Sequence, residues 1–262
     1  MAFTKVNEIT MHYRDDGPSD GPALVFANSL GTNLHLWDPI LPHLPEGLRI
    51  IRYDKRGHGQ SDVPPAPYAM GTLVKDAEAL LDQLNIGDCV FVGLSIGGMI
   101  AQGLAVKRLD QIRALVLSNT AAKIGTKELW QSRIDAVRTG GIASIADAVM
   151  DRWFSRDFLA SPKLNTWREM LISQSDEGYI GCCAAIAGTD FYTPTSGLRL
   201  PLLGIAGSED GATPPDLVRE TVDLVPGSEF QLMRRTGHLP CVEQPEAYAK
   251  HLTGFLRRIG HI

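Results

Sequence analysis

The sequence predicts an α/β protein built on a mainly parallel sheet. Short apolar runs that suit strands alternate with longer segments of helical period. The middle runs are apolar throughout, as expected of strands that helices cover on both faces. Such alternation favours parallel strands joined by right-handed crossovers. We expect strands at residues 9–13, 23–27, 49–53, 89–93, 114–118, 201–206 and 229–233.

Helices are expected between these strands, and one long interval contains helices alone. The helices that alternate with strands are predicted at residues 35–44, 71–84, 97–107, 216–224 and 245–258. No convincing strand occurs between about residues 122 and 196, where helical patches are predicted at 128–138, 142–153, 165–175 and 177–188. We therefore predict a core formed by residues 1–121 and 197–262, with a helical insertion at 122–196 that we call the cap.

Composition excludes several classes of protein. A chain of 262 residues has the length of one large domain with an insertion. The apolar fraction of 44% and the charged fraction of 21% are ordinary for a globular protein. The net charge of −5 offers no electrostatic footprint for nucleic acid or an anionic membrane, so we expect neither as a partner. A small anionic substrate remains compatible with this charge.

The N-terminal residues and the cysteines favour a cytoplasmic protein. The first residues lack the cationic and apolar regions of a signal peptide, and no apolar run approaches the ~20 residues of a membrane span. We expect buried, reduced thiols, because Cys89, Cys182, Cys183 and Cys241 form no metal-ligand spacing. No nucleotide-binding or metal-binding motif follows any predicted strand, so we expect no cofactor and no metal.

A G-x-S-x-G motif at residues 93–97 marks the candidate nucleophile, Ser95. An apolar strand leads directly into the motif and a helix follows it, which is the context of a nucleophile elbow. The sharp turn would push the serine hydroxyl out of the sheet, and the glycines at both ends leave room for it. The competing interpretation is a glycine-rich turn in which Ser95 only caps the helix.

A serine nucleophile needs a base, and His238 is the candidate. It follows a strand-like run and precedes the last helix, so its loop lies at the carboxyl edge of the sheet. His251 lies inside a predicted helix and His261 in the tail. The remaining histidines precede the elbow in the chain: His12, His35, His43 and His58.

The acid that would orient the histidine should follow the strand at 201–206. Glu209 and Asp210 both qualify by chemistry, and Asp210 could instead cap the next helix. The acid would fix the imidazole tautomer and stabilise the imidazolium.

The oxyanion hole is predicted from backbone N–H groups. One is that of Ile96, the residue after the nucleophile, and the other comes from the loop after the strand at 23–27, where we expect Leu30. The polar turn at residues 54–61 resembles a second site, but its glycines suit a structural turn below the first one, with His58 as a turn residue.

With these residues in place, the chain resembles the α/β-hydrolase superfamily over nearly its full length, and within it the 3-oxoadipate enol-lactonases. The matching stretches are residues 28–38, 53–61 and 93–103, with further likeness in the cap at 130–138 and 152–154. The pair Asn28-Ser29 best distinguishes this resemblance from one to other α/β-hydrolases, because related hydrolases usually carry His-Gly at these two positions. The resemblance implies an eight-stranded, mainly parallel sheet flanked by helices. It also favours Asp210 over Glu209, since Asp210 occupies the acid position of the Gly-x-x-Asp pattern.

The resemblance implies hydrolysis of 3-oxoadipate enol-lactone to 3-oxoadipate in the β-ketoadipate pathway of aromatic catabolism. That substrate carries a carboxylate, and the cap supplies candidate cations in Arg133, Arg138 and Arg152. Arg133 is the first choice, because its spacing from Trp130 puts both on one helix face, with Trp153 as a further pocket residue. The alternative is that Arg133 is a solvated surface residue.

Other functions fit the same motifs. A carboxylesterase, a carbon–carbon bond hydrolase or a perhydrolase would share the elbow, because fold does not fix function. A ligand sensor could keep the same three residues and turn over slowly. An inactive scaffold is disfavoured by the intact serine, histidine and acid.

Overall fold

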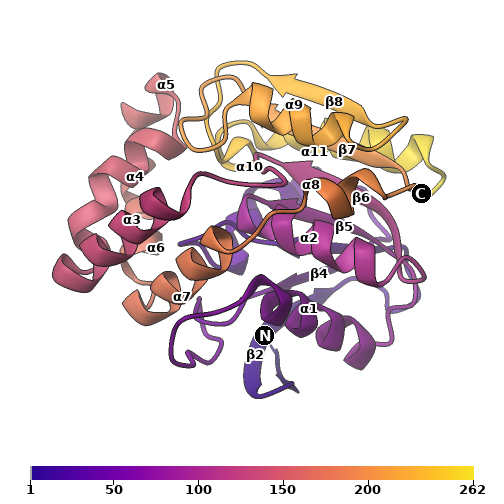
Figure 1. Cartoon of the computed structure of the whole chain (residues 1–262). Helices are drawn as coiled ribbons and strands as arrows, with labels where there is room; N and C mark the ends of the chain where they lie inside the picture. The colour runs from indigo at the N-terminus through magenta and orange to yellow at the C-terminus, as the bar shows by residue number, and fades with distance from the viewer. Residues whose placement is uncertain (1) are drawn as a thin grey trace.

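The computed structural model describes residues 2–262 and contains one eight-stranded sheet in the order β1-β2-β4-β3-β5-β6-β7-β8 (Figure 1). Strand β2 is antiparallel to both of its neighbours, and all the other neighbouring pairs are parallel. This confirms the predicted α/β class. The strands are β1 (Ala2–Val6), β2 (Ile9–Asp16), β3 (Ala23–Ala27), β4 (Arg49–Tyr53), β5 (Cys89–Leu94), β6 (Ile112–Ser118), β7 (Leu202–Gly207) and β8 (Glu229–Met233).

The first strand is the one that the residue pattern did not predict. β1 lies at the edge of the sheet and pairs with β2 alone. Its side chains alternate between partly exposed and exposed until Val6, and Phe3 is 54% exposed. Five residues with one buried side chain carry little hydrophobic periodicity, so the pairing with β2 decides their conformation.

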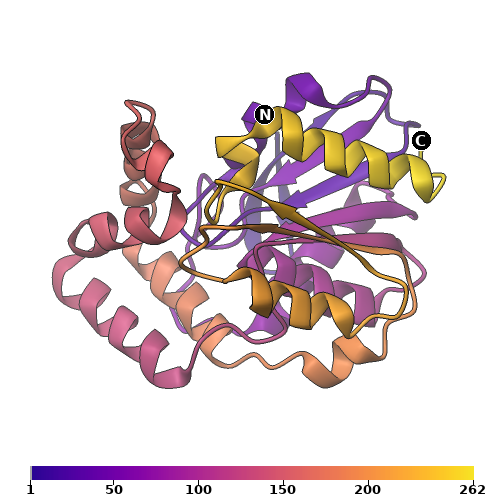
Figure 2. The same ribbon diagram turned by 90° about the horizontal axis from the view of Figure 1, so that it is seen from above.

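Helices cover both faces of the sheet. Figure 2 shows α11 (Pro245–Arg258) on one face and α2 (Ile96–Lys107) with α9 (Pro215–Asp223) on the other. Helix α1 (Met70–Gln83) packs on α2. The predicted helix at 35–44 is instead a 3-10 helix, η1 (Leu34–His43), because Pro39 and Pro42 lack the N–H groups that an α-helix needs. The short α10 (Pro240–Glu243) was not predicted.

Only helices lie between β6 and β7 in the chain. They are α3 (Lys127–Gly140), η2 (Ile142–Ile145), α4 (Ala146–Trp153), α5 (Arg156–Leu159), α6 (Leu164–Ile172), α7 (Asp176–Ala187) and α8 (Tyr192–Ser196). Helix α3 packs on α7 and α4 packs on α6, and this group stands beside the sheet in both views (Figures 1 and 2). Helix α8 packs on α2, so the chain rejoins the core layer before β7 begins.

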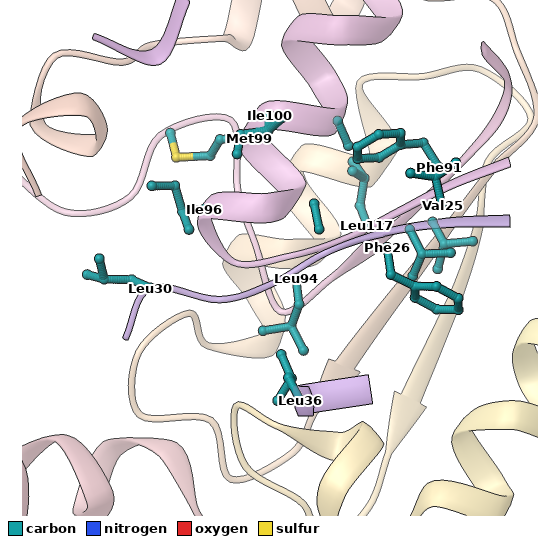
Figure 3. Packing of buried hydrophobic residues seen from close by; sticks show 14 of the residues in the cluster. Val25, Phe26, Leu30, Leu36, Phe91, Leu94, Ile96, Met99, Ile100 and Leu117 are labelled. Carbon is teal, nitrogen blue, oxygen red and sulfur yellow. The ribbon is translucent and has the colours of Figure 1, made fainter. Parts of the chain in front are cut away.

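The central strands form the buried core. Every residue of β3 and β5 is buried, and α2 is apolar around its circumference because it lies between the sheet and α1. Figure 3 shows Phe91 of β5 on the side of the sheet where α2 carries Met99 and Ile100, and Phe26 of β3 on the opposite side, where it packs on Trp37. The parallel strands end at one edge, so the loops after them meet there. Within residues 2–262, no helix is long and apolar enough to cross a membrane.

Candidate active site

Ser95 lies at the junction of β5 and α2, in the strained backbone conformation of an elbow. Its φ of 58° is in the left-handed region, which residues with a side chain rarely adopt. The N–H of Ser95 donates to the carbonyl of Ser118, and its carbonyl accepts from the hydroxyl of Thr120. These bonds hold the turn, and the strain is typical of a functional site.

The two glycines of the motif allow the close approach that the elbow requires. A Cβ on Gly93 would lie 2.2 Å from the carbonyl oxygen of Gly97. A Cβ on Gly97 would lie 2.1 Å from the carbonyl oxygen of Ala27, at the end of β3. Both positions exclude any side chain, so α2 can begin directly beside the loop that follows β3.

His238 and Asp210 are in contact and buried. Nδ1 of His238 lies 2.8 Å from Oδ2 of Asp210, and the two residues are 1% and 5% exposed. The same carboxylate oxygen accepts from Asn119 Nδ2 at 2.9 Å and from Thr213 Oγ1 at 2.8 Å. Oδ1 accepts from the N–H groups of Ala212 and Thr213. This ring of donors fixes the carboxylate against the imidazole.

The surroundings of Asp210 favour its ionised form. Burial alone would raise the pKa of its carboxyl group. The charge and hydrogen bond of His238, with the hydrogen bonds from Asn119 and Thr213, outweigh burial, and the pKa lies below its ordinary value. Glu209, the other candidate acid, is exposed and accepts a hydrogen bond from the N–H of Arg156 in the cap. Asp210 is therefore the acid that faces the histidine.

Ser95 and His238 line one pocket, together with Ser29 and Leu30. In this structure Nε2 of His238 lies 3.5 Å from the hydroxyl of Ser29. No hydrogen bond joins Ser95 to His238 in the described chain, and bonds between a nucleophile and its base often tighten only when substrate binds. Ser29 was not singled out as a site residue; its signal was the Asn28-Ser29 pair. Asn28 itself is structural, because its amide bonds the carbonyl of Tyr53 and the indole of Trp37.

The predicted oxyanion donors lie on neighbouring segments. Figure 3 shows Leu30 in the segment that follows β3 and Ile96 at the start of α2. Neither N–H donates to a backbone acceptor in the described chain. The start of α2 adds the positive end of a helix dipole beside Ser95. Two free N–H groups near a buried hydroxyl can bind a developing oxyanion.

The cap contributes Trp130 and Arg133 from α3, and both line the same pocket as Ser95. The guanidinium carbon of Arg133 lies 5.5 Å from the centroid of the Trp130 ring. Arg133 also donates a long hydrogen bond of 3.4 Å to the Tyr179 hydroxyl. No carboxylate of residues 2–262 forms a salt bridge with Arg133.

Arg152 and Trp153 of α4 complete this side of the pocket. Arg152 donates to the carbonyl of Gly211 at 3.3 Å and has no salt-bridge partner in the described chain. Burial, and then the charge of Arg133, lower the pKa of Arg152. The carbonyl of Trp153 accepts a hydrogen bond of 2.7 Å from the N–H of His238, so the cap is bonded to the histidine loop. Arg138, the third candidate cation, is exposed and near Asp135.

Several site residues had weak signals in the sequence. Asn119 follows β6 and bonds both Asp210 and the Gly237 carbonyl, but a lone Asn after a strand is common in turns. Thr213 had only the Thr-Pro pattern as its signal. Residues 2–262 contain no group of three His, Cys, Asp or Glu side chains that could hold a metal ion.

Comparison with known proteins agrees with this arrangement. A 3-oxoadipate enol-lactonase of Acinetobacter baylyi is 35% identical over 253 residues, covering 96% of this chain and 94% of that protein. The enol-lactonase structure from Burkholderia xenovorans is 36% identical, with a TM-score of 0.94 and coverage of 98% of this chain and 100% of that one. A malate-bound esterase from Thermogutta terrifontis is 28% identical, with a TM-score of 0.90 and coverage of 96% and 94%.

The family match covers most of the chain and includes the elbow and the histidine loop. A family described as the alpha/beta hydrolase fold matches residues 22–245. The eight-stranded sheet, the elbow at Ser95 and the relatives above agree with that match. This chain belongs to the α/β-hydrolase family.

Proposed function

We propose that this protein opens the ring of 3-oxoadipate enol-lactone by serine catalysis. Ser95 is the nucleophile, His238 the general base and Asp210 the acid that orients it. The observation that carries the substrate class is the pair Arg133 and Arg152, because both line the pocket of Ser95 without an acidic partner in the described chain. Two uncompensated cations favour a substrate that brings its own carboxylate.

Acylation would proceed through one tetrahedral intermediate. The Ser95 hydroxyl attacks the ring carbonyl while Nε2 of His238 takes its proton. The N–H groups of Leu30 and Ile96 hold the oxyanion. Collapse breaks the ring C–O bond, and the enol oxygen receives the proton from His238. The enol tautomerises to the ketone, which leaves the acyl chain on Ser95.

Deacylation uses the same groups on a water molecule. His238 takes a proton from water, and the resulting hydroxide attacks the acyl carbonyl. The second oxyanion occupies the same pair of N–H groups. Collapse returns the proton to Ser95 and releases 3-oxoadipate with two carboxylates. An enolate is a better leaving group than an alkoxide or an amine. Opening this lactone therefore depends less on proton donation by His238 than cleavage of an alkyl ester or a peptide does.

Substrate orientation would come from the cap. The guanidinium of Arg133 lies over the ring face of Trp130, and both residues line the pocket. The stacking, with the apolar stem of the arginine, holds the guanidinium at the pocket wall. Arg152 reaches the pocket from α4, on the side of the Asp210 loop. Burial, and then the charge of Arg133, lower the pKa of Arg152, and a carboxylate between the two arginines would offset both. The ring carbonyl would then point toward Ser95.

A steady-state assay with purified protein tests this proposal. The substrates are 3-oxoadipate enol-lactone, its methyl ester at the carboxylate, and nitrophenyl acetate, each with the Ser95→Ala variant as the blank. We expect kcat/KM to be highest for the free carboxylate form. A higher value for nitrophenyl acetate or the methyl ester would favour a general carboxylesterase, and a single burst without turnover would favour a ligand sensor.

The esterase alternative has one specific observation in its favour, the likeness to the Thermogutta terrifontis esterase at 28% identity. We further propose that the enzyme acts in the cytoplasm, in the β-ketoadipate pathway. All four cysteines are free and buried, which suits a reducing compartment.

A further inference from the structure

Lys55 is a buried cation in the turn after β4, below the loop of residues 28–32, which we call the oxyanion loop. The residue is 2% exposed. Its ammonium group donates to the carbonyl of Ser29 at 2.7 Å and to that of Thr32 at 3.4 Å. No carboxylate of residues 2–262 forms a salt bridge with it. Burying an ammonium without a counter-ion is costly, and both of its acceptors belong to the oxyanion loop.

The bond from Lys55 is the shortest of three that the Ser29 carbonyl accepts, the others coming from the N–H and the hydroxyl of Thr32, and together they set where the next N–H points. In a trans peptide the carbonyl of one residue and the N–H of the following residue point in opposite directions. The one cis peptide of the described chain is Ala66-Pro67, so the Ser29–Leu30 peptide is trans. Because the Ser29 carbonyl points toward Lys55, the N–H of Leu30 points away from Lys55. Leu30 lines the pocket.

We propose that Lys55 is a positioning residue that orients and polarises the Ser29–Leu30 peptide, whose N–H is the oxyanion donor. A cation at the carbonyl oxygen draws electron density from the amide and makes its N–H a stronger donor. This inference rests on the proposed serine mechanism. It assigns a role in that mechanism to a turn that the sequence indicated to be only structural.

Other residues of the same turn bond the oxyanion loop and the start of η1. Nε2 of His58 accepts the N–H of Gly31 at 3.0 Å. Oδ1 of Asp54 accepts the N–H of Leu34 at 2.7 Å. Lys55 is the member that binds carbonyls and carries a positive charge, so it acts on the peptide whose N–H remains free. The turn therefore bonds the oxyanion loop and the start of η1 through three different side chains.

The charge state of Lys55 gives the proposal a pH signature. Burial lowers the pKa of Lys55 to about 8, against the opposing influence of Cys182 and Asp54. The titratable groups that face it are Asp54 and His58 of its own turn and Cys182 of α7. Lys55 is mostly protonated at neutral pH and loses its charge within the range in which enzymes can be assayed.

The direct test replaces Lys55 by methionine, which keeps the volume and removes the charge. The Ser29 carbonyl still accepts from the N–H and the hydroxyl of Thr32, so the loop keeps bonded partners. An oxyanion donor is worth on the order of a hundredfold to a thousandfold in kcat. A displaced donor should lose much of this, so Lys55→Met should lower kcat about tenfold to a hundredfold with little change in KM.

Three comparisons make this result specific. The loss should be equal on the enol-lactone and on nitrophenyl acetate, because both form the same oxyanion. The affinity for a trifluoromethyl ketone, which forms a tetrahedral adduct with the serine, should fall by the same factor, whereas a competitive inhibitor that forms no adduct should bind unchanged. Lys55→Arg should recover part of kcat. Lys107→Met, on the exposed end of α2, is the matched control and should match the wild type.

The pH profile supplies a second measurement on the unmodified enzyme. As pH rises through about 8, kcat should fall several-fold because the Ser29–Leu30 peptide loses its cation. The stability contribution of Lys55 has the opposite sign. Its pKa in the folded state lies below the unfolded value of about 10.4, so the unfolded state binds more protons between these values and this contribution rises with pH. In Lys55→Met the alkaline fall in kcat should be absent.

The outcomes separate this inference from the proposed function. If Ser95→Ala keeps its activity, the serine mechanism itself is wrong. If Ser95→Ala is inactive but folded Lys55→Met keeps kcat within about twofold of the wild type, only the role of Lys55 is overturned. Should Lys55→Met fail to fold, the wild-type profile decides: a fall near pH 8 supports the role, and a flat profile overturns it.

Discussion

The core loops and the cap helices line one pocket, but they hold their polar side chains differently. Asp210 in the core accepts hydrogen bonds from Asn119, Thr213 and His238, all of them buried. Arg133 and Arg152 in the cap each make one long hydrogen bond, of 3.4 and 3.3 Å, and have no acidic partner in residues 2–262.

The difference matches the two tasks of an enzyme. Proton transfer needs groups whose geometry and ionisation are set before substrate arrives, and a dense set of donors provides both. Recognition of a charged substrate needs a cation that has no partner in the free enzyme, because the substrate supplies that partner when it binds. The comparison predicts that core substitutions act on kcat for every substrate, whereas cap substitutions act on KM for charged substrates.

The largest expected effect is that of Ser95→Ala. Removing the nucleophile should lower kcat on the order of a million-fold on every substrate, because the remaining groups cannot form the acyl intermediate. Activity and circular dichroism should be measured on the same sample. Substantial turnover by a folded variant would show that Ser95 is not the nucleophile and that the core loops do not carry out the chemical step.

The next effect separates two acids of one loop. Asp210→Asn should lower kcat by about four orders of magnitude, because an amide favours the wrong imidazole tautomer. Glu209→Gln is the matched control, since Glu209 is exposed and accepts only from the N–H of Arg156. We expect its kcat/KM to stay near that of the wild type. The reverse ranking would transfer the acid role to Glu209.

The cap substitutions should have smaller and selective effects. A charge-assisted hydrogen bond contributes about 1.5–3 kcal/mol, so Arg133→Ala should raise KM for the carboxylated lactone roughly ten- to a hundredfold. Arg152→Ala should act in the same direction. The methyl ester of the substrate should be nearly unaffected by either. An equal rise in KM for both substrates would indicate general damage to the cap. No rise for either would mean that the arginine does not bind the substrate carboxylate.

The smallest effect concerns stability in acid. The pKa of Asp210 lies below its ordinary value of 3.8 in the folded protein, so the unfolded state binds the proton more tightly. Its contribution to stability is therefore complete above the unfolded pKa and is lost as pH falls through the folded one. Urea unfolding at pH 7 and near pH 3 should show a shallower acid loss in Asp210→Asn than in the wild type. Identical pH dependence would contradict this.

The outcome differs between elements according to how local their signals are. β5, the elbow and α2 could be predicted because one continuous segment carries the apolar run, the two glycines and the helical period. The edge strand β1 could not, because its conformation depends on pairing with β2. η1 had helical periodicity, but two prolines changed its hydrogen bonding from α to 3-10.

The candidate site divides in the same way. Ser95, His238 and Asp210 each lie in a loop directly after a strand, and such loops meet at one edge of a parallel sheet. Asn119 gave no comparable signal, because a carboxamide acquires its role from residues far away in the chain. The contact of Asn119 with Asp210 spans 91 positions.

By itself, the sequence determined the α/β class, the order of the central strands and helices, and the loops that carry Ser95, His238 and the candidate acids, since these depend on local periodicity and on where strands end. Only the tertiary structure decided which acid faces His238, which cap arginines reach the pocket without a partner, and what Lys55 bonds. Those outcomes depend on distances between loops of different strands, and no local pattern encodes such distances.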